Sequence, residues 1–170
     1  MQYFKTASDE IFAYENDVTL ETINELQSGL TSITEAQALA ILNPTPTLSD
    51  YKDDLDLVRL GKERLGITVT GHSSGNIAMQ TDASSRALMS NYIVISMADT
   101  LLTVDWRAPD GSVTQYNMAD FKKLSGAVTS YVNLCMQRQN ALIGALDAAS
   151  DPSTVDLNSG WPSTTIAVTF

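Results

Sequence analysis

The sequence has few of the side chains on which most enzyme chemistry depends. It contains one histidine and one cysteine among 170 residues, and aromatic residues make up 7% of the chain. Metal or acid-base catalysis needs several suitable groups that converge, so the supply is thin. His72, which we expect in a loop, would need carboxylates alone as co-ligands. We therefore expect no catalytic residue, no metal site and no cofactor, and a protein that is not an enzyme.

Two short motifs resemble catalytic elements without meeting their requirements. The stretch "GHSSG" is similar to a nucleophile elbow, but that motif needs a helix directly after it and a histidine downstream, and the only histidine is the neighbour of Ser73. The carboxylates of "DDLD" (53–56) point in different directions on a predicted helix. Cys135 lies on the inner stripe of another predicted helix, where a thiol behaves as a small apolar group.

Basic residues are also scarce. Ten lysines and arginines face twenty aspartates and glutamates, and the net charge of −10 excludes nucleic acid as the expected partner. Residues 1–66 carry a net charge of −7, so most of the acidic surplus lies on the first third of the chain. We expect protein partners.

Long apolar runs and a leader sequence are missing as well. The most apolar stretch, "YIVISM" (92–97), is far shorter than the roughly 18 residues of a membrane span, and the N-terminus lacks the basic-then-apolar order of a signal peptide. We expect synthesis in the cytosol and no membrane insertion.

Residues 1–42 are predicted to form a small module of a β-hairpin and helices. The runs "QYF" and "IFAY" favour two strands around the turn-like "TASDE". Helical spacing follows in "TLETINELQSG", and "TEAQALAIL" opens with Thr34 and Gln37 in capping-box positions. Two prolines in "NPTPTLSD" favour extended chain, so residues 43–50 are predicted to link this module to the rest.

Residues 51–162 are predicted to form the main domain, which makes the fold class α+β. A short helix places Leu55, Val58 and Leu65 on one stripe, the strand "ITVTG" follows, and a helix is expected over 83–98. The second half of that helix is apolar on nearly every face, which is typical of a helix central to the core. Its predicted packing residues are Leu88, Tyr92, Ile93 and Ile95.

A hairpin and a long helix complete the main domain. In "VDWRAPDGSVTQYN", Pro109, Asp110 and Gly111 favour a three-residue loop with a bulge. That register pairs Trp106 with Thr114 and places Leu102, Val104, Trp106, Thr114 and Tyr116 on one face. A helix of about 30 residues is then expected, longer than a small domain needs, so its C-terminal part is predicted to contact a partner or the N-terminal module. Its predicted inner stripe is Phe121, Leu124, Val128, Val132, Cys135, Leu142 and Leu146.

The chain ends in a predicted strand, residues 163–170, with no turn leading back. Alternation places Thr164, Ile166, Val168 and Phe170 on one side, and an uncovered apolar strand would be adhesive. Such a strand can cover a sheet edge of its own chain or of another. We expect it to leave the domain and bind a neighbouring subunit or partner, which makes those four residues the candidate partner-binding site.

Several motifs in order resemble a known family. The order "GITVTGHS", "MQTDASSRALMSN", "VDWRAPDGSV", "YVNLCMQRQNALI" and "SGWPS" is similar to a domain of unknown function widespread in tailed-phage tail-fibre and fibre-assembly proteins. The opening "MQYFKTASDEIFAYENDVT" with "GLTSITEAQA" resembles small tail-fibre assembly proteins. The chain departs from the family at Gln139, where an acidic residue is common, and in the strand after Trp-Pro.

This resemblance implies a non-enzymatic bacteriophage tail protein that acts by protein-protein contacts. It would be made in the host bacterial cytoplasm and serve as a fibre assembly factor or as a resident subunit of the virion tail, with tail-fibre or other tail proteins, or further copies of itself, as partners. The alternative is a receptor- or glycan-binding module at a fibre tip. The position of Trp106, Tyr116 and Trp161 separates the two, because exposed aromatic rings would stack on sugars.

Overall fold

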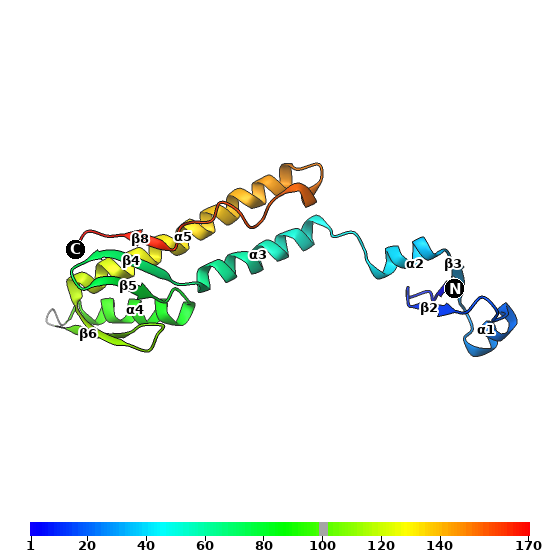
Figure 1. The fold of residues 1–170 in the computed structure, drawn as a ribbon, viewed down its shortest axis with the longest axis horizontal. Coiled ribbons are helices and arrows are strands. Elements are labelled where there is room, and N and C mark those ends of the chain that lie inside the picture. Colours follow the sequence, from blue (N-terminus) through cyan, green and yellow to red (C-terminus); the bar gives the residue numbers. More distant parts are fainter. Residues whose placement is uncertain (99–101) are drawn as a thin grey trace. The chain divides into compact units, whose positions relative to one another are not determined.

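The computed structural model describes residues 1–98 and 102–170. The chain divides into two compact units, Met1–Thr47 and Leu48–Phe170, and the division falls inside the predicted 43–50 linker (Figure 1). Residues 48–50, which we expected to be extended, already belong to the first helix of the second unit. The helices and strands together form the α+β fold that the sequence predicts.

The first unit contains a three-stranded antiparallel sheet and two short helices. The predicted hairpin pairs β1 (Gln2–Lys5) with β2 (Ile11–Tyr14). A third strand, β3 (Thr31–Ile33), pairs with the other edge of β1 and was not predicted from the sequence, because three residues give too short a pattern. The helices are α1 (Leu20–Leu26) and α2 (Glu35–Leu42).

The first unit has a well-formed helix cap but a small hydrophobic core. Thr34 and Gln37 form the predicted capping box at the start of α2. The buried apolar residues of the unit are Phe4, Ile23 and Ala38, whereas Leu26 and Leu42 are mostly exposed. So small a core contributes little stability of its own.

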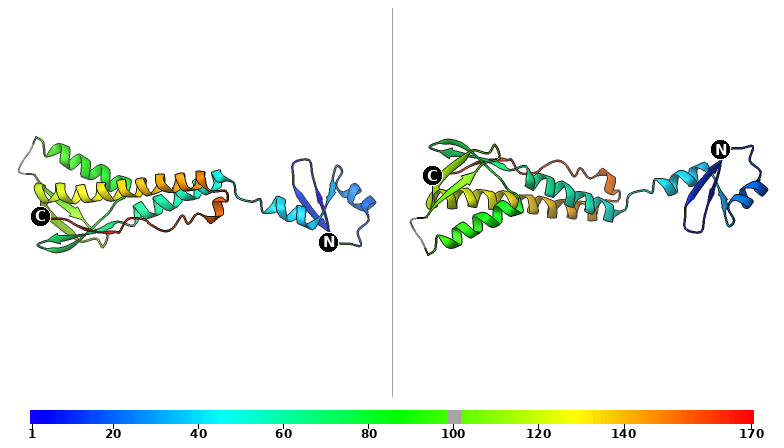
Figure 2. Two further views of the ribbon diagram at one scale, coloured as in Figure 1. Left: turned by 90° about the horizontal axis from the view of Figure 1, so that it is seen from above. Right: turned by 90° about the horizontal axis from the view of Figure 1, so that it is seen from below.

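The second unit is arranged around one long helix. Its helices are α3 (Leu48–Arg64), α4 (Ala83–Ile95) and α5 (Met118–Ala148), with a 3-10 turn at Pro152–Thr154. One sheet has the strand order β5-β4-β8, and a hairpin joins β6 to β7. Helix α4 lies beside the N-terminal part of α5 and α3 beside its C-terminal part (Figure 2). The strands are β4 (Ile67–His72), β5 (Gly75–Met79), β6 (Thr103–Arg107), β7 (Val113–Asn117) and β8 (Thr165–Ala167).

Helix α5 begins at an N-cap, where the Asn117 side chain accepts a hydrogen bond from the Asp120 backbone amide at 2.9 Å. All seven residues of its predicted inner stripe are buried. The N-terminal half packs in the main core with residues of β4 to β7, and the C-terminal half packs against α3 through Leu55. Contact with α3 therefore covers the part of α5 that we expected to reach a partner or the N-terminal module. The stripe expected on α3 is wrong at Leu65, which is 66% exposed because it follows the end of the helix.

Polar contacts tie the end of α3 to the core. The hydroxyl of the buried Tyr131 donates to the carbonyl of Lys62 at 2.8 Å, and burial raises the pKa of this phenol. The hydroxyl of Thr81 donates to the Glu63 carbonyl and accepts from the Gly66 amide. These bonds satisfy buried backbone groups that would otherwise destabilise the turn between α3 and β4.

The β6–β7 hairpin has the predicted register. Trp106 pairs with Thr114, and the loop closes through a hydrogen bond from the Ala108 amide to the Ser112 carbonyl at 2.8 Å. Asp110 accepts from the Ser112 amide, and Gly111 has the positive φ of 86° that the bulge requires. Trp106 and Tyr116 are buried, as expected, whereas Thr114, which pairs with Trp106, is exposed.

We expect Trp106→Ala to destabilise the second unit by about 3–5 kcal/mol, because Trp106 is 4% exposed and packs against Phe121. Chemical unfolding monitored by circular dichroism measures this loss. Val113→Ala, at an exposed position of the same hairpin, is the control and should change stability by less than about 0.5 kcal/mol. Equal unfolding midpoints for the two variants would contradict the importance of the buried indole.

The C-terminal strand lies on the sheet of its own chain. β8 runs parallel to β4, and the Val168 amide donates to the Thr70 carbonyl at 3.0 Å. Ile166, Val168 and Phe170 pack against the main core, while Thr164 is exposed. The expectation that this strand leaves the domain is therefore wrong. After α5 the chain reverses, and residues 149–164 run back alongside the helix to β8 (Figure 1). No hairpin turn leads into β8, so the sequence pattern does not predict this path.

The absence of a side chain at Gly71 allows the chain at the end of β8 to lie close to β4. A Cβ atom at Gly71 would lie 2.2 Å from the Val168 carbonyl oxygen, whereas a Cβ at Gly75 would meet nothing within 4 Å, and both glycines have φ of 99°. We expect Gly71→Ala to displace β8 and to speed hydrogen exchange at the Val168 amide. Gly75→Ala carries the same backbone strain without the clash, so it should leave that amide protected. Equal protection in both variants would show that β8 does not depend on this close approach.

Candidate functional site: a groove between two helices

Helix α4 lies at the surface of the second unit, and this corrects a prediction. Leu88 is 45% exposed and Ile95 is 53% exposed, while Tyr92 and Ile93 are half-buried. Met89 is the buried residue of the helix. The apolar second half of α4 indicated a central helix, but the main core already fills with residues of α5 and the strands, so one face of α4 is enough to close it.

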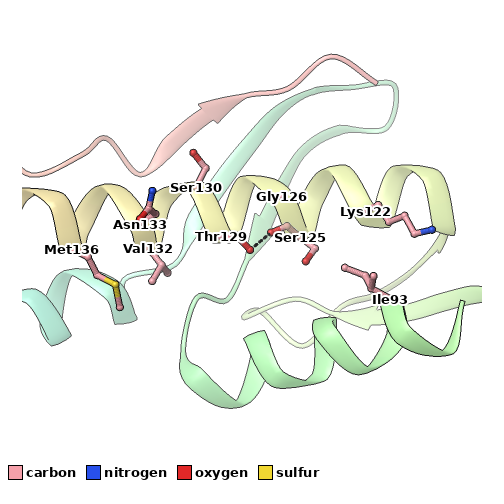
Figure 3. Close-up of a pocket in the computed structure, with 9 residues that line it drawn as sticks. All are labelled: Ile93, Lys122, Ser125, Gly126, Thr129, Ser130, Val132, Asn133 and Met136. Atoms are coloured by element: carbon pink, nitrogen blue, oxygen red, sulfur yellow. Dashed lines mark hydrogen bonds between the residues drawn. The ribbon is translucent and has the colours of Figure 1, made fainter. Parts of the chain in front are cut away.

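A groove runs between α4 and α5 (Figure 3). It is an open groove of about 670 Å³, lined on α5 by residues from Lys122 to Met136, with Ile93 contributed by α4. Close to Ile93 in the chain, Val94 and Met97 are 64% and 81% exposed. Exposed aliphatic side chains beside an open groove are typical of a surface that contacts another protein.

Small residues line the middle of the groove. Ser125, Gly126, Thr129 and Ser130 stand on α5 where larger side chains would fill the space, and a Cβ at Gly126 would meet nothing within 4 Å. The Thr129 hydroxyl donates to the Ser125 carbonyl at 2.9 Å (Figure 3). Because this hydroxyl already has a partner within the helix, an apolar group can cover it without leaving an unpaired donor.

The charge in the groove differs from that of the whole chain. Lys122 lies near one end, and none of the described lining residues is acidic. The chain as a whole carries a net charge of −10. The groove is therefore a mainly apolar surface with a cation near one end, in an otherwise acidic protein.

The residues predicted from the sequence as site residues lie elsewhere. Trp106 and Tyr116 are in the core, Asp110 and Gly111 form the hairpin turn, and β8 belongs to its own sheet. The groove could have been found from one signal: small residues recur at helical spacing on the face of α5 that adjoins the apolar stripe. A pattern of small residues says nothing about which element lies beside it, so the groove itself needed the structure.

The single histidine and the single cysteine both pack against other residues of the second unit. The His72 ring contacts the Phe170 ring edge-on at 4.6 Å, its Nδ1 lies 2.6 Å from the Ser74 hydroxyl, and its Nε2 lies 3.7 Å from Asp120. Cys135 is fully buried, and burial raises the pKa of its thiol. Across residues 1–98 and 102–170 no group of three potential metal ligands gathers. In the same ranges no helix is long and apolar enough to cross a membrane.

Comparison with known families finds a match that lies within the second unit. The family described as a domain of unknown function, DUF4376, matches residues 51–159. This is more than half of the chain, which therefore belongs to that family. No protein of curated function matches the chain, and no solved structure matches it.

Asp82 fixes the start of α4 and thereby one wall of the groove. Its carboxylate accepts the Ser85 amide at 3.0 Å, and hydrogen bonds from the hydroxyls of Ser84 and Ser85 hold the pKa of Asp82 well below its ordinary 3.8. We expect Asp82→Ala to lower stability by about 1 kcal/mol at neutral pH, the usual value of an N-cap.

The pH dependence of that loss follows from the lowered pKa. The folded state favours the charged form, so the stabilisation is complete above the ordinary pKa of 3.8 and disappears as the pH falls below it. Asp82→Asn keeps an acceptor at the cap but does not ionise, so it should retain most of the stability without this acid dependence. Thermal unfolding of both variants between pH 2 and 7 measures the effect. An Asp82→Ala loss that stays constant at acidic pH would contradict the assignment.

Proposed function

We propose that this protein is a non-enzymatic bacteriophage tail protein that associates with tail fibres and acts by protein-protein contacts. Its motifs, in order, resemble a domain found in tail-fibre and fibre-assembly proteins. The observation that carries the contact function is the groove between α4 and α5. Val94 and Met97, which follow Ile93 in the sequence, are also exposed. Leaving such side chains in water is unfavourable, so their cover by a partner would stabilise a complex.

The glycan-binding alternative has less support. Sugar recognition commonly uses exposed aromatic rings, and Trp106 and Tyr116 are buried. Trp161 is half-buried between the two core clusters, and its indole donates to the Leu157 carbonyl at 2.9 Å. The three aromatic residues that would have served a glycan site therefore pack inside the second unit.

The first unit supports a contact function for a separate reason. Leu20, Leu26, Leu39 and Leu42 are each more than half exposed on helices of seven and eight residues. Short helices gain most of their stability from packing an apolar face, so exposed leucines favour a partner that covers them. Its acidic character, with Lys5 as the one basic residue of Met1–Thr47, favours a partner with basic groups.

Affinity purification of the tagged protein from phage-infected cells, followed by mass spectrometry, tests the proposal. We expect a tail-fibre or other tail protein to copurify in amounts comparable to the bait. Mass spectrometry of purified virions then separates the two forms of the proposal, because an assembly factor is lost from mature particles and a resident subunit is retained. Absence of tail proteins from the purified complexes, together with absence of the protein from virions, would reject it.

A further inference from the structure

We propose that the groove between α4 and α5 binds one amphipathic α-helix of a partner protein, with its apolar face toward Ile93 and Met136 and an acidic side chain near Lys122. This inference rests on the proposed function, since it names the kind of segment that a tail partner would supply. Three properties of the groove select a helix with this chemistry: its hydrogen-bonding capacity, its dimensions and its charge.

Hydrogen bonding argues for a helix over an extended segment. The residues that line the groove belong to two helices, and the α5 residues from Lys122 to Met136 lie well inside a helix whose backbone groups bond within it. An extended peptide would find no strand edge there for its own amides and carbonyls, and leaving those groups unpaired is costly. A helix satisfies its backbone internally and offers side chains alone.

The dimensions of the groove match a short helix. Lys122 and Met136 lie fourteen residues apart on α5, which corresponds to about 21 Å, or roughly four helical turns. Along this length the small side chains of Gly126, Thr129 and Ser130 let a second helix approach closely. A volume of about 670 Å³ has room for several large aliphatic side chains.

Charge selects the polar part of the partner helix. Lys122 lines the groove, and no acidic residue is among the described lining. The next residue, Lys123, does not line it, because its Nζ lies over the Phe170 ring. A glutamate or aspartate on the partner would meet Lys122 at short range. The acidic surplus of the rest of the chain acts over longer distances, where salt at physiological strength screens it beyond about 8 Å.

Synthetic peptides provide a direct probe of the groove in the full-length protein. The first is a sixteen-residue amphipathic helix with leucine at every third or fourth position and glutamate on the opposite face, and the second has lysine in place of glutamate. Fluorescence anisotropy measures binding of each labelled peptide. We expect the glutamate peptide to bind more tightly than the lysine peptide. Equal binding of the two, or tighter binding of the lysine peptide, would overturn the charge assignment and with it the proposal.

A pair of glycine substitutions on α5 locates the binding surface. Gly126 lines the groove and Gly144 does not, yet both are exposed and a Cβ at either would meet nothing within 4 Å. Gly126→Leu should fill the groove and weaken the glutamate peptide by roughly tenfold or more, a loss of about 1.4 kcal/mol. Gly144→Leu is the matched control and should bind as the unaltered protein does. Circular dichroism verifies that both variants fold, and equal affinity in the two would overturn the proposal.

A charge reversal tests the position of the acidic contact. Lys122→Glu should remove the preference for the glutamate peptide and favour the lysine peptide, since the apolar contacts remain. An unchanged preference would place the acidic contact elsewhere and overturn the proposed orientation. Light scattering of the protein without peptide supplies a further test: a dimer that Gly126→Leu dissociates would assign the groove to a second copy of the chain.

The copurification experiment keeps this inference separate from the proposed function. If a tail protein copurifies with the unaltered protein and equally with Gly126→Leu, the tail function stands and the groove is not its docking surface. If no tail protein copurifies and the protein is absent from virions while the peptides behave as expected, the groove binds helices and the tail function is wrong. Loss of the tail protein with Gly126→Leu and its retention with Gly144→Leu supports both.

Discussion

The second unit depends on covering the apolar stripe of α5. This helix has 31 residues, which corresponds to about 46 Å, and buried side chains extend from Met118 to Leu146. The strands and α4 meet its N-terminal half, and α3 with the 151–161 segment meets its C-terminal half. Tyr131 joins the two regions, because its buried ring packs in the main core while its hydroxyl bonds to the end of α3. Burial of this one stripe therefore joins α3, α4 and the strands into one unit.

The groove is a consequence of the same arrangement. Two sheets and α3 use the apolar stripe of α5, so the adjoining face, which carries Gly126 and Thr129, has only the edge of α4 beside it. Helix α4 is held by its Asp82 cap and by the buried Met89, which leaves Val94 and Met97 uncovered. A face with small residues suits a second helix, and the molecule supplies none there among the residues that the structure describes. This arrangement is the physical basis of the contact function that we propose.

The extent to which the sequence could predict the molecule varied with the range of the interactions. Local signals were sufficient for the α5 stripe, for the Thr34–Gln37 capping box and for the hairpin register of Trp106, because each depends on residues a few positions apart. The β3 strand was missed, since three residues give no detectable period. The C-terminal strand, which we expected to leave the domain, pairs with β4 of its own chain. The groove was not predicted at all.

The sequence by itself determined the helices and hairpins, the α+β class, and which residues of α5 face inward, because hydrophobic spacing and capping act within one element. Only the tertiary structure decided which apolar faces find cover. α4 and β8 are two contrasting examples. Both carry apolar side chains, but Ile95 of α4 is exposed, whereas Ile166 of β8 packs partly buried against the core. The pattern of an apolar face is the same whether its own chain or another covers it, so cover depends on where the remaining elements pack.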